Sequence, residues 1–107
     1  MDRLPAVRRC FLENRVLYSR HARHEMVAEE FGSITDDEIA EAVAEGEIIE
    51  SYPAAEPYPS VLIHGRTRRG RPVHVVAAYS ERDNLCVVVT VYHPDPSRWI
   101  EYRRRRR

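Results

Sequence analysis

The feature that most constrains this chain is a change in the spacing of its apolar residues after Gly46. Before Gly46, apolar side chains recur about every three or four residues, which is typical of helices that bury one face. After Gly46, they alternate with polar side chains, which is typical of strands with one buried face. Helices followed by strands predict an α+β domain in which the helices pack on one face of the sheet.

Three helices are expected before Gly46. The first covers about residues 3–13, with Asp2 as its cap, and the second covers about residues 20–31. The third is predicted from the segment ITDDEIAEAVAEGE, in which Thr35 and Glu38 have the spacing of a capping box. Acidic residues in its first turn favour the positive end of the helix dipole.

Four strands are expected after Gly46. Their links are short and rich in turn residues, so consecutive strands should pair in a four-stranded antiparallel meander. Residues 16–18 are interpreted as a brief extended link, and a helical turn is expected around Trp99. The five arginines at 103–107 are expected to be disordered, which leaves residues 1–102 as a single domain. The strands are predicted at about residues 47–52, 60–67, 71–79 and 85–93.

Length and composition indicate where such a domain works. No apolar run approaches the roughly 20 residues of a membrane span, and the first residues lack the apolar segment of a signal peptide. Cys10 and Cys86 lack the spacing of zinc ligands and are expected to be buried, reduced thiols. These features predict a cytoplasmic protein without a cofactor.

Charge is segregated along the chain, although the net charge is zero. Residues 1–24 hold six arginines and two acids, and residues 25–56 hold eleven acids without lysine or arginine. Residues 57–107 hold eleven arginines and four acids, and the chain has no lysine. Arginine suits phosphate recognition because its fork donates two hydrogen bonds at once. GC-rich codon usage is another explanation for the missing lysines, but it does not explain the segregation.

Alternation assigns the strand side chains to two faces, with turns centred near residues 56, 69 and 82. This register places His64 opposite His74, His74 opposite Thr90, and Glu50 near Leu62. The face expected beneath the helices is wholly apolar, with Ile49, Val61, Ile63, Val73, Val75, Ala77, Val87, Val89 and Val91. The opposite face, called the polar face below, carries Glu50, Tyr52, Leu62, His64, Arg66, His74, Val76, Thr90 and Tyr92.

The polar face has two interpretations. It is either an ordinary half-exposed sheet surface, which includes contact with a partner protein, or a site that acts on RNA. In a site, histidines would move protons, arginines would stabilise a phosphorane-like transition state, and aromatic rings would stack on unpaired bases. His64 and His74 are also close enough in register to share a metal ion, but no third ligand is placed beside them, so no metal site is predicted.

Four segments resemble the DUF4258 family, in the variety found beside small YgiT-type (MqsA-like) zinc-finger antitoxins. They are YSRHA at 18–22, ITDDEIAEAVAEGEIIESYP at 34–53, LIHGRTRRGRPVHVV at 62–76 and VVVTVYHPDPSRW at 87–99. The resemblance implies a RelE/ParE-like fold and a toxin role in a type II toxin–antitoxin module. It also implies a nearby zinc-finger antitoxin as a partner, and RNA or a ribosome as a target.

The chain differs from the usual family motif in one segment. Members of the family often show H-A-x-x-R-M-x-E-R-G-I, whereas this chain reads HARHEMVAEEFGSI. Glu25 therefore stands where the family has an arginine, and the loop before Ile34 is longer. If that arginine contacts RNA or orients His21, the expected site is weakened here.

The first functional hypothesis is a metal-independent endoribonuclease of the mRNA interferase type. His74 would act as a general base or acid on the ribose 2′-hydroxyl, and Arg71 or Arg66 would hold the phosphate. Tyr92 and His64 would assist the reaction or stack on bases. The remaining candidates, expected to contact the substrate, are His21, Glu50, Tyr52, Arg66 and Thr90.

The second hypothesis is a binding protein without catalysis. The eleven acids between residues 25 and 56 suit a basic partner, such as an antitoxin, although a solvated helix face would have the same composition. The arginine tail would give affinity for phosphates of any sequence, or would act only as a solubilising end.

Overall fold

The computed structural model describes residues 3–107, so the expected helix cap, Asp2, lies outside the described residues. Three helices come first, and no helix in the described part of the chain is long and apolar enough to cross a membrane. The helices are α1 (Leu4–Leu12), α2 (Arg20–Ala28) and α3 (Asp36–Glu45). The strands are β1 (Val16–Tyr18), β2 (Glu47–Tyr52), β3 (Ser60–Arg66), β4 (Pro72–Ser80), β5 (Leu85–Tyr92), β6 (Trp99–Ile100) and β7 (Arg104–Arg105).

The main sheet has five strands in the order β1-β5-β4-β3-β2, and its pairing is mixed. Strands β2 to β5 form the expected antiparallel meander. The prediction of only four antiparallel strands was wrong at one edge, because β1 pairs with β5 in parallel. The residues of β1 have a strand-like composition, but their partner lies far along the chain, and spacing alone does not identify such a partner.

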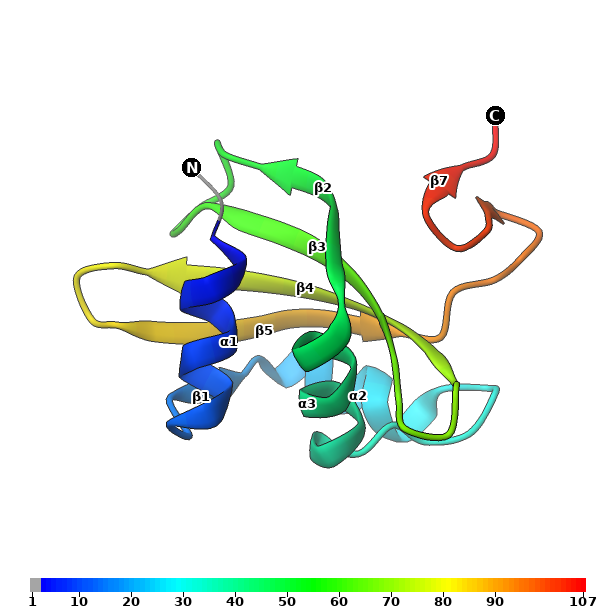
Figure 1. The fold of residues 1–107 in the computed structure, drawn as a ribbon, viewed down its shortest axis with the longest axis horizontal. Coiled ribbons are helices and arrows are strands. Elements are labelled where there is room, and N and C mark those ends of the chain that lie inside the picture. Colours follow the sequence, from blue (N-terminus) through cyan, green and yellow to red (C-terminus); the bar gives the residue numbers. More distant parts are fainter. Residues whose placement is uncertain (1–2) are drawn as a thin grey trace.

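The helices cover one face of this sheet, as expected (Figure 1). The Ser19 hydroxyl accepts a hydrogen bond from the backbone N–H of Ala22 and caps α2. The predicted capping box of Thr35 and Glu38 is present at the start of α3. The core combines apolar residues from the helices with those from the covered sheet face, including Val7, Met26, Ile39, Val43, Ile63, Val75 and Val88. Both cysteines are buried and free.

Two β-bulges shift which side chains reach this core. The pairing of β2 with β3 slips between Ile48 and Glu50, so Ile48 packs against the core in place of the predicted Ile49. The pairing of β4 with β5 slips between Val76 and Ala77. On β5, the core side chains before the bulge are therefore Cys86 and Val88, and the predictions for Val87 and Val89 were wrong. A bulge adds one residue to one strand and reverses the alternation beyond it.

Gly65 lets α3 lie close against β3. A Cβ atom on Gly65 would stand 1.9 Å from the carbonyl oxygen of Ala42, so the helix backbone would have to move. We expect Gly65→Ala to lower the free energy of unfolding by about 1–3 kcal/mol, measured by urea denaturation. Ser51→Ala, at an exposed position on β2, is the matched control. Equal unfolding midpoints for the two variants would contradict this packing.

The C-terminal segment is ordered differently from the prediction. Trp99 begins strand β6 rather than a helical turn, and Arg104–Arg105 form β7, whereas disorder was expected. We call Trp99–Arg105 the C-terminal hairpin. It lies apart from all three helices (Figure 1). Its loop residues Glu101 and Tyr102 both have positive φ, at 53° and 62°, a conformation that costs energy for residues other than glycine.

Candidate functional site

The sheet brings most of the predicted polar-face residues together. His64 lies opposite His74, and Glu50 lies opposite Leu62, as predicted. The prediction that His74 faces Thr90 was wrong, because the register of β4 with β5 places Tyr92 opposite His74. Thr90 instead lies opposite Val76. The closest neighbours of His74 across the sheet are therefore a histidine and a tyrosine.

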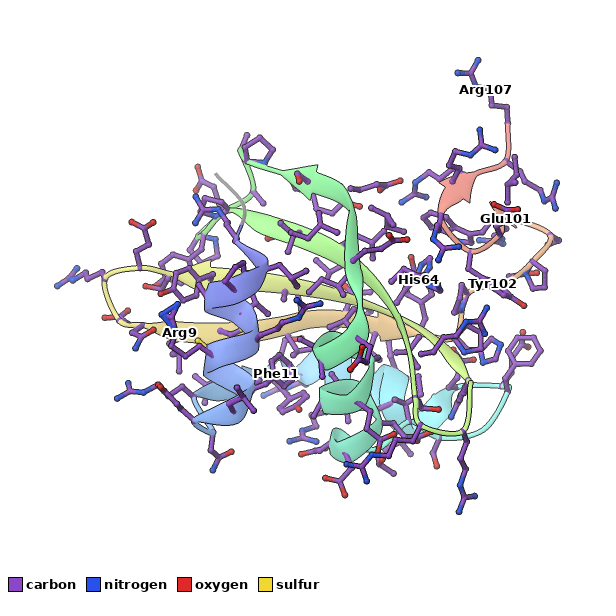
Figure 2. The ribbon with its side chains drawn as sticks, viewed as in Figure 1. Arg9, Phe11, His64, Glu101, Tyr102 and Arg107 are labelled. Atoms are coloured by element: carbon purple, nitrogen blue, oxygen red, sulfur yellow. The ribbon has the colours of Figure 1, made fainter. Side chains whose placement is uncertain are left out.

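The C-terminal hairpin covers this group. The Trp99 and His74 rings lie nearly perpendicular with centroids 4.5 Å apart, and the Tyr102 ring stacks on His64 at 6.1 Å. Figure 2 shows His64 pointing toward Tyr102. The Arg105 guanidinium donates to both carboxylate oxygens of Glu50, at 2.7 and 3.1 Å. These contacts bury His64 and His74 at the centre of the predicted polar face, whereas Arg66 at its border remains exposed.

His74 is neutral because it is buried, and its two partners determine which ring nitrogen carries the proton. The side chain is fully buried, at 0% exposure, and its Nε2 lies 2.7 Å from the carbonyl oxygen of Tyr102. Because a carbonyl only accepts, Nε2 carries the proton, and Nδ1 accepts from the Tyr92 hydroxyl at 3.2 Å. Burial lowers the pKa of His74 to about 4, so the imidazole is neutral near pH 7.

His64 is less completely satisfied than His74. It is 3% exposed, and its Nδ1 is buried without a hydrogen-bond partner. Burial lowers its pKa, and the nearby guanidinium groups of Arg103 and Arg66 act in the same direction. A buried ring nitrogen without a hydrogen-bond partner lowers the stability of the fold. Packing of the surrounding side chains therefore holds His64 in this position.

Tyr92 connects this interior to a cleft of about 720 Å³ between α2, the end of β5 and the C-terminal hairpin. Tyr92 is half-buried, and burial raises its pKa to about 12. A ligand in the cleft therefore meets Tyr92, with His74 behind it. The cleft is lined by His24, Glu25, Ala28, Glu29, Glu30, Phe31, Val91, Tyr92, His93, Asp95, Arg98, Trp99 and Arg105.

Several predicted site residues have other roles. The Arg71 guanidinium donates to the carbonyl oxygens of Gly32 and Ser33, to Glu38 and to Nδ1 of His93, so it fastens the loop between α2 and α3. His21 lies on α2 with its Nε2 3.4 Å from Glu25. The hydrogen bonds and ion pairs found for Arg71 and His21 within residues 3–107 are thus made with residues other than His74.

The other predicted substrate contacts lie at the border of the polar face. The Tyr52 hydroxyl donates to Glu50, and the hydrogen bond from Arg105 is the main reason that the pKa of Glu50 is lowered. Arg66 donates to the Gly70 carbonyl, and its guanidinium lies over the Tyr102 ring at 5.6 Å. These side chains hold the C-terminal hairpin and the turn after β3 in place.

Glu25 on α2 and Glu29, which directly follows that helix, bind the free edge of β5 and the residue after it. Glu25 accepts from the backbone N–H of Val91 at 3.0 Å, and Glu29 accepts from that of His93 at 2.7 Å. Beyond the end of β1, these carboxylates take the place of a neighbouring strand. An arginine at position 25 has no acceptor for the Val91 N–H, so Glu25 has a structural role here.

The chain neutralises much of its own acidic segment. Of the eleven acids between 25 and 56, at least seven have a partner within residues 3–107. The partnered acids are Glu25, Glu29, Asp36, Glu38, Glu41, Glu47 and Glu50, and arginine side chains bind Asp36, Glu38, Glu47 and Glu50. Within these described residues, no group of three or more histidine, cysteine, aspartate or glutamate residues has an arrangement that could hold a metal ion.

Comparison with known protein families gives one match. The family model described as "Domain of unknown function (DUF4258)" matches residues 18–93. The chain belongs to the DUF4258 family. No curated protein and no solved structure gives a match to the chain. In this DUF4258 chain, the match includes His64, His74 and Tyr92 but ends before the C-terminal hairpin that covers them.

Some residues around the cleft were not predicted from the sequence. His93 was not among the predicted site residues, but it lines the cleft and stacks on Phe31. Trp99 and Arg98 follow a predicted turn, and the residue types there do not indicate that the chain folds back onto the sheet. The Tyr102 contact is made by a backbone carbonyl, so no residue type in the sequence indicates it.

Proposed function

We propose that this protein is a RelE/ParE-like toxin of a type II toxin–antitoxin module, and that it cleaves RNA without a metal ion. The observation that carries the proposal is the Tyr92–His74 pair beside the cleft. Tyr92 donates to Nδ1 of His74, while the Tyr102 carbonyl holds Nε2. A neutral imidazole whose orientation is fixed can accept a proton from the hydroxyl that is hydrogen-bonded to it, as general base catalysis requires.

The proposed reaction begins at the ribose 2′-hydroxyl of an RNA strand in the cleft. Its proton passes to the Tyr92 oxygen while Tyr92 gives its own proton to Nδ1 of His74. The 2′-oxygen bonds to the adjacent phosphorus, the bond from phosphorus to the 5′-oxygen breaks, and that oxygen takes a proton from His24 or water. With a pKa of about 4, the His74 imidazolium is a transient species, which the Tyr102 carbonyl stabilises.

The phosphate needs a cation as negative charge develops on it. Arg98 is exposed and lines the cleft, which makes it the best-placed guanidinium for this role. Arg105 also lines the cleft, but Glu50 partly neutralises it. We therefore assign phosphate contact to Arg98, in place of Arg71 and Arg66, which make intramolecular hydrogen bonds.

Ion pairs within the chain reduce the acidic surface that a basic protein could bind. Arginines of the same chain bind several of the acids in residues 25–56. The proposed antitoxin partner and the cytoplasmic location rest on the family resemblance and on the buried, free cysteines.

The proposal is tested with purified protein and labelled single-stranded RNA in EDTA, with and without ribosomes. We expect cleavage in at least one of the two conditions, and none with material purified in parallel from cells that lack the gene. Adding the product of the adjacent gene should suppress the cleavage. Intact RNA in both conditions would refute the ribonuclease function.

A further inference from the structure

Phe31 presents an aromatic face at the rim of the cleft. Its side chain is 53% exposed, and its ring stacks on His93 with centroids 4.7 Å apart and an angle of 29° between the planes. Both rings line the cleft. One face of Phe31 is thus supported by the imidazole, and more than half of the residue remains open to solvent.

The support beneath Phe31 is fixed by hydrogen bonds on both sides. Arg71 donates to the carbonyl oxygens of Gly32 at 2.5 Å and Ser33 at 2.9 Å, which fastens the loop that carries Phe31. Arg71 also donates to Nδ1 of His93, and Glu29 accepts from the His93 backbone N–H. A platform that is already ordered loses little conformational entropy when a flat ligand binds to it.

The surroundings indicate the chemistry of that ligand. The cleft has the size typical of a small-molecule site, and it combines aromatic rings with the polar groups of Tyr92, His24 and Arg98. Four carboxylates also line it, and two of them, Glu25 and Glu29, already accept from the backbone N–H groups of Val91 and His93. A purely apolar ligand would leave these polar groups unpaired. A nucleotide has both a flat aromatic base and an anionic phosphate, so it matches both parts of the cleft.

We propose that the Phe31–His93 platform binds one unpaired nucleobase by stacking. The phosphate of the same nucleotide lies toward Arg98. This inference rests on the proposed function, since it names the part of the RNA that occupies the same cleft. Recognition by stacking selects unpaired strands and tolerates different bases, because every base has an aromatic face.

The experiment uses Trp99, the single tryptophan, which lines the cleft and reports binding by its fluorescence. The protein is titrated with a tetramer of deoxyadenosine, which lacks the 2′-hydroxyl and resists the proposed reaction, and with the same backbone carrying abasic sites. We expect the tetramer with bases to bind about tenfold more tightly. Phe31→Ala should remove this preference without changing the affinity for the abasic backbone.

Two variants serve as controls. Phe31→Tyr keeps an aromatic ring and should keep the preference for bases, and Leu12→Ala removes another exposed apolar side chain, 87% exposed on α1, and should change nothing. Circular dichroism checks that each variant is folded. Equal affinity for the two oligomers, no binding of either one, or an unchanged preference in Phe31→Ala would overturn the stacking site. Base-dependent binding without RNA cleavage would support the stacking site and refute the ribonuclease function. RNA cleavage together with an unchanged preference for bases in Phe31→Ala would support the ribonuclease function and refute the stacking site.

Discussion

Tyr92→Phe is expected to slow RNA cleavage at least about 100-fold, measured as the single-turnover rate at saturating enzyme. The change removes the hydroxyl that donates to Nδ1 of His74, and it keeps the aromatic ring of a residue that lines the cleft. Proton transfer from the substrate would then lack its first acceptor. Affinity for the RNA should change little, because the ring still lines the cleft.

The matched control is Tyr79→Phe, which removes a hydroxyl of the same kind away from the cleft. The Tyr79 hydroxyl donates to Asn84 near the turn between β4 and β5. Both changes delete one side-chain hydrogen bond, so each should lower the free energy of unfolding by about 1 kcal/mol. If Tyr92→Phe cleaves RNA as fast as Tyr79→Phe, the proposed path of the proton is wrong.

The protein is expected to lose stability as the pH falls from 7 to 5, because His74 is buried in its neutral form. Its pKa is about 4 in the folded state and returns to the ordinary value of 6.5 on unfolding. Between these values the unfolded chain binds more protons, so acidification favours unfolding. The loss from His74 is roughly 2 kcal/mol over this interval, measured by urea denaturation at each pH.

The His74→Gln variant separates this effect from other titrations. Glutamine does not titrate, so the variant should show a smaller difference between pH 7 and pH 5. Burial lowers the pKa values of His64 and His93 in the same direction, and these residues account for a remaining dependence in the variant. An equal pH dependence in the wild type and the variant would show that His74 titrates normally in the folded protein.

The sequence was informative wherever local chemistry determines structure. The capping box of Thr35 and Glu38, the cap at Ser19 and the antiparallel pairing of β2 to β5 follow from residue types and short links. Alternation identified His64 and His74 as neighbours, because no bulge separates them along β3 and β4. Most of the polar group behind the cleft was thus predictable.

The rest depends on interactions that residue types do not encode. Bulges on β2 and β5 reversed the facing of the residues before them in each strand, and β1 pairs with a strand that is distant in sequence. The C-terminal hairpin was missed because a run of arginines is typical of disorder. Here Arg103 and Arg105 instead bind Glu47 and Glu50 on β2. This hairpin covers His64 and His74 at the centre of the predicted polar face and borders the cleft beside Tyr92.

The chemistry of the RNA ends tests the central claim most directly. If Tyr92 and His74 activate the 2′-hydroxyl, mass spectrometry of the cleaved RNA will find a 2′,3′-cyclic phosphate on one fragment and a 5′-hydroxyl on the other. The same strand made of DNA will remain intact. Fragments with 5′-phosphate ends, or equal cleavage of DNA, would show that the 2′-oxygen is not the nucleophile and would contradict the account.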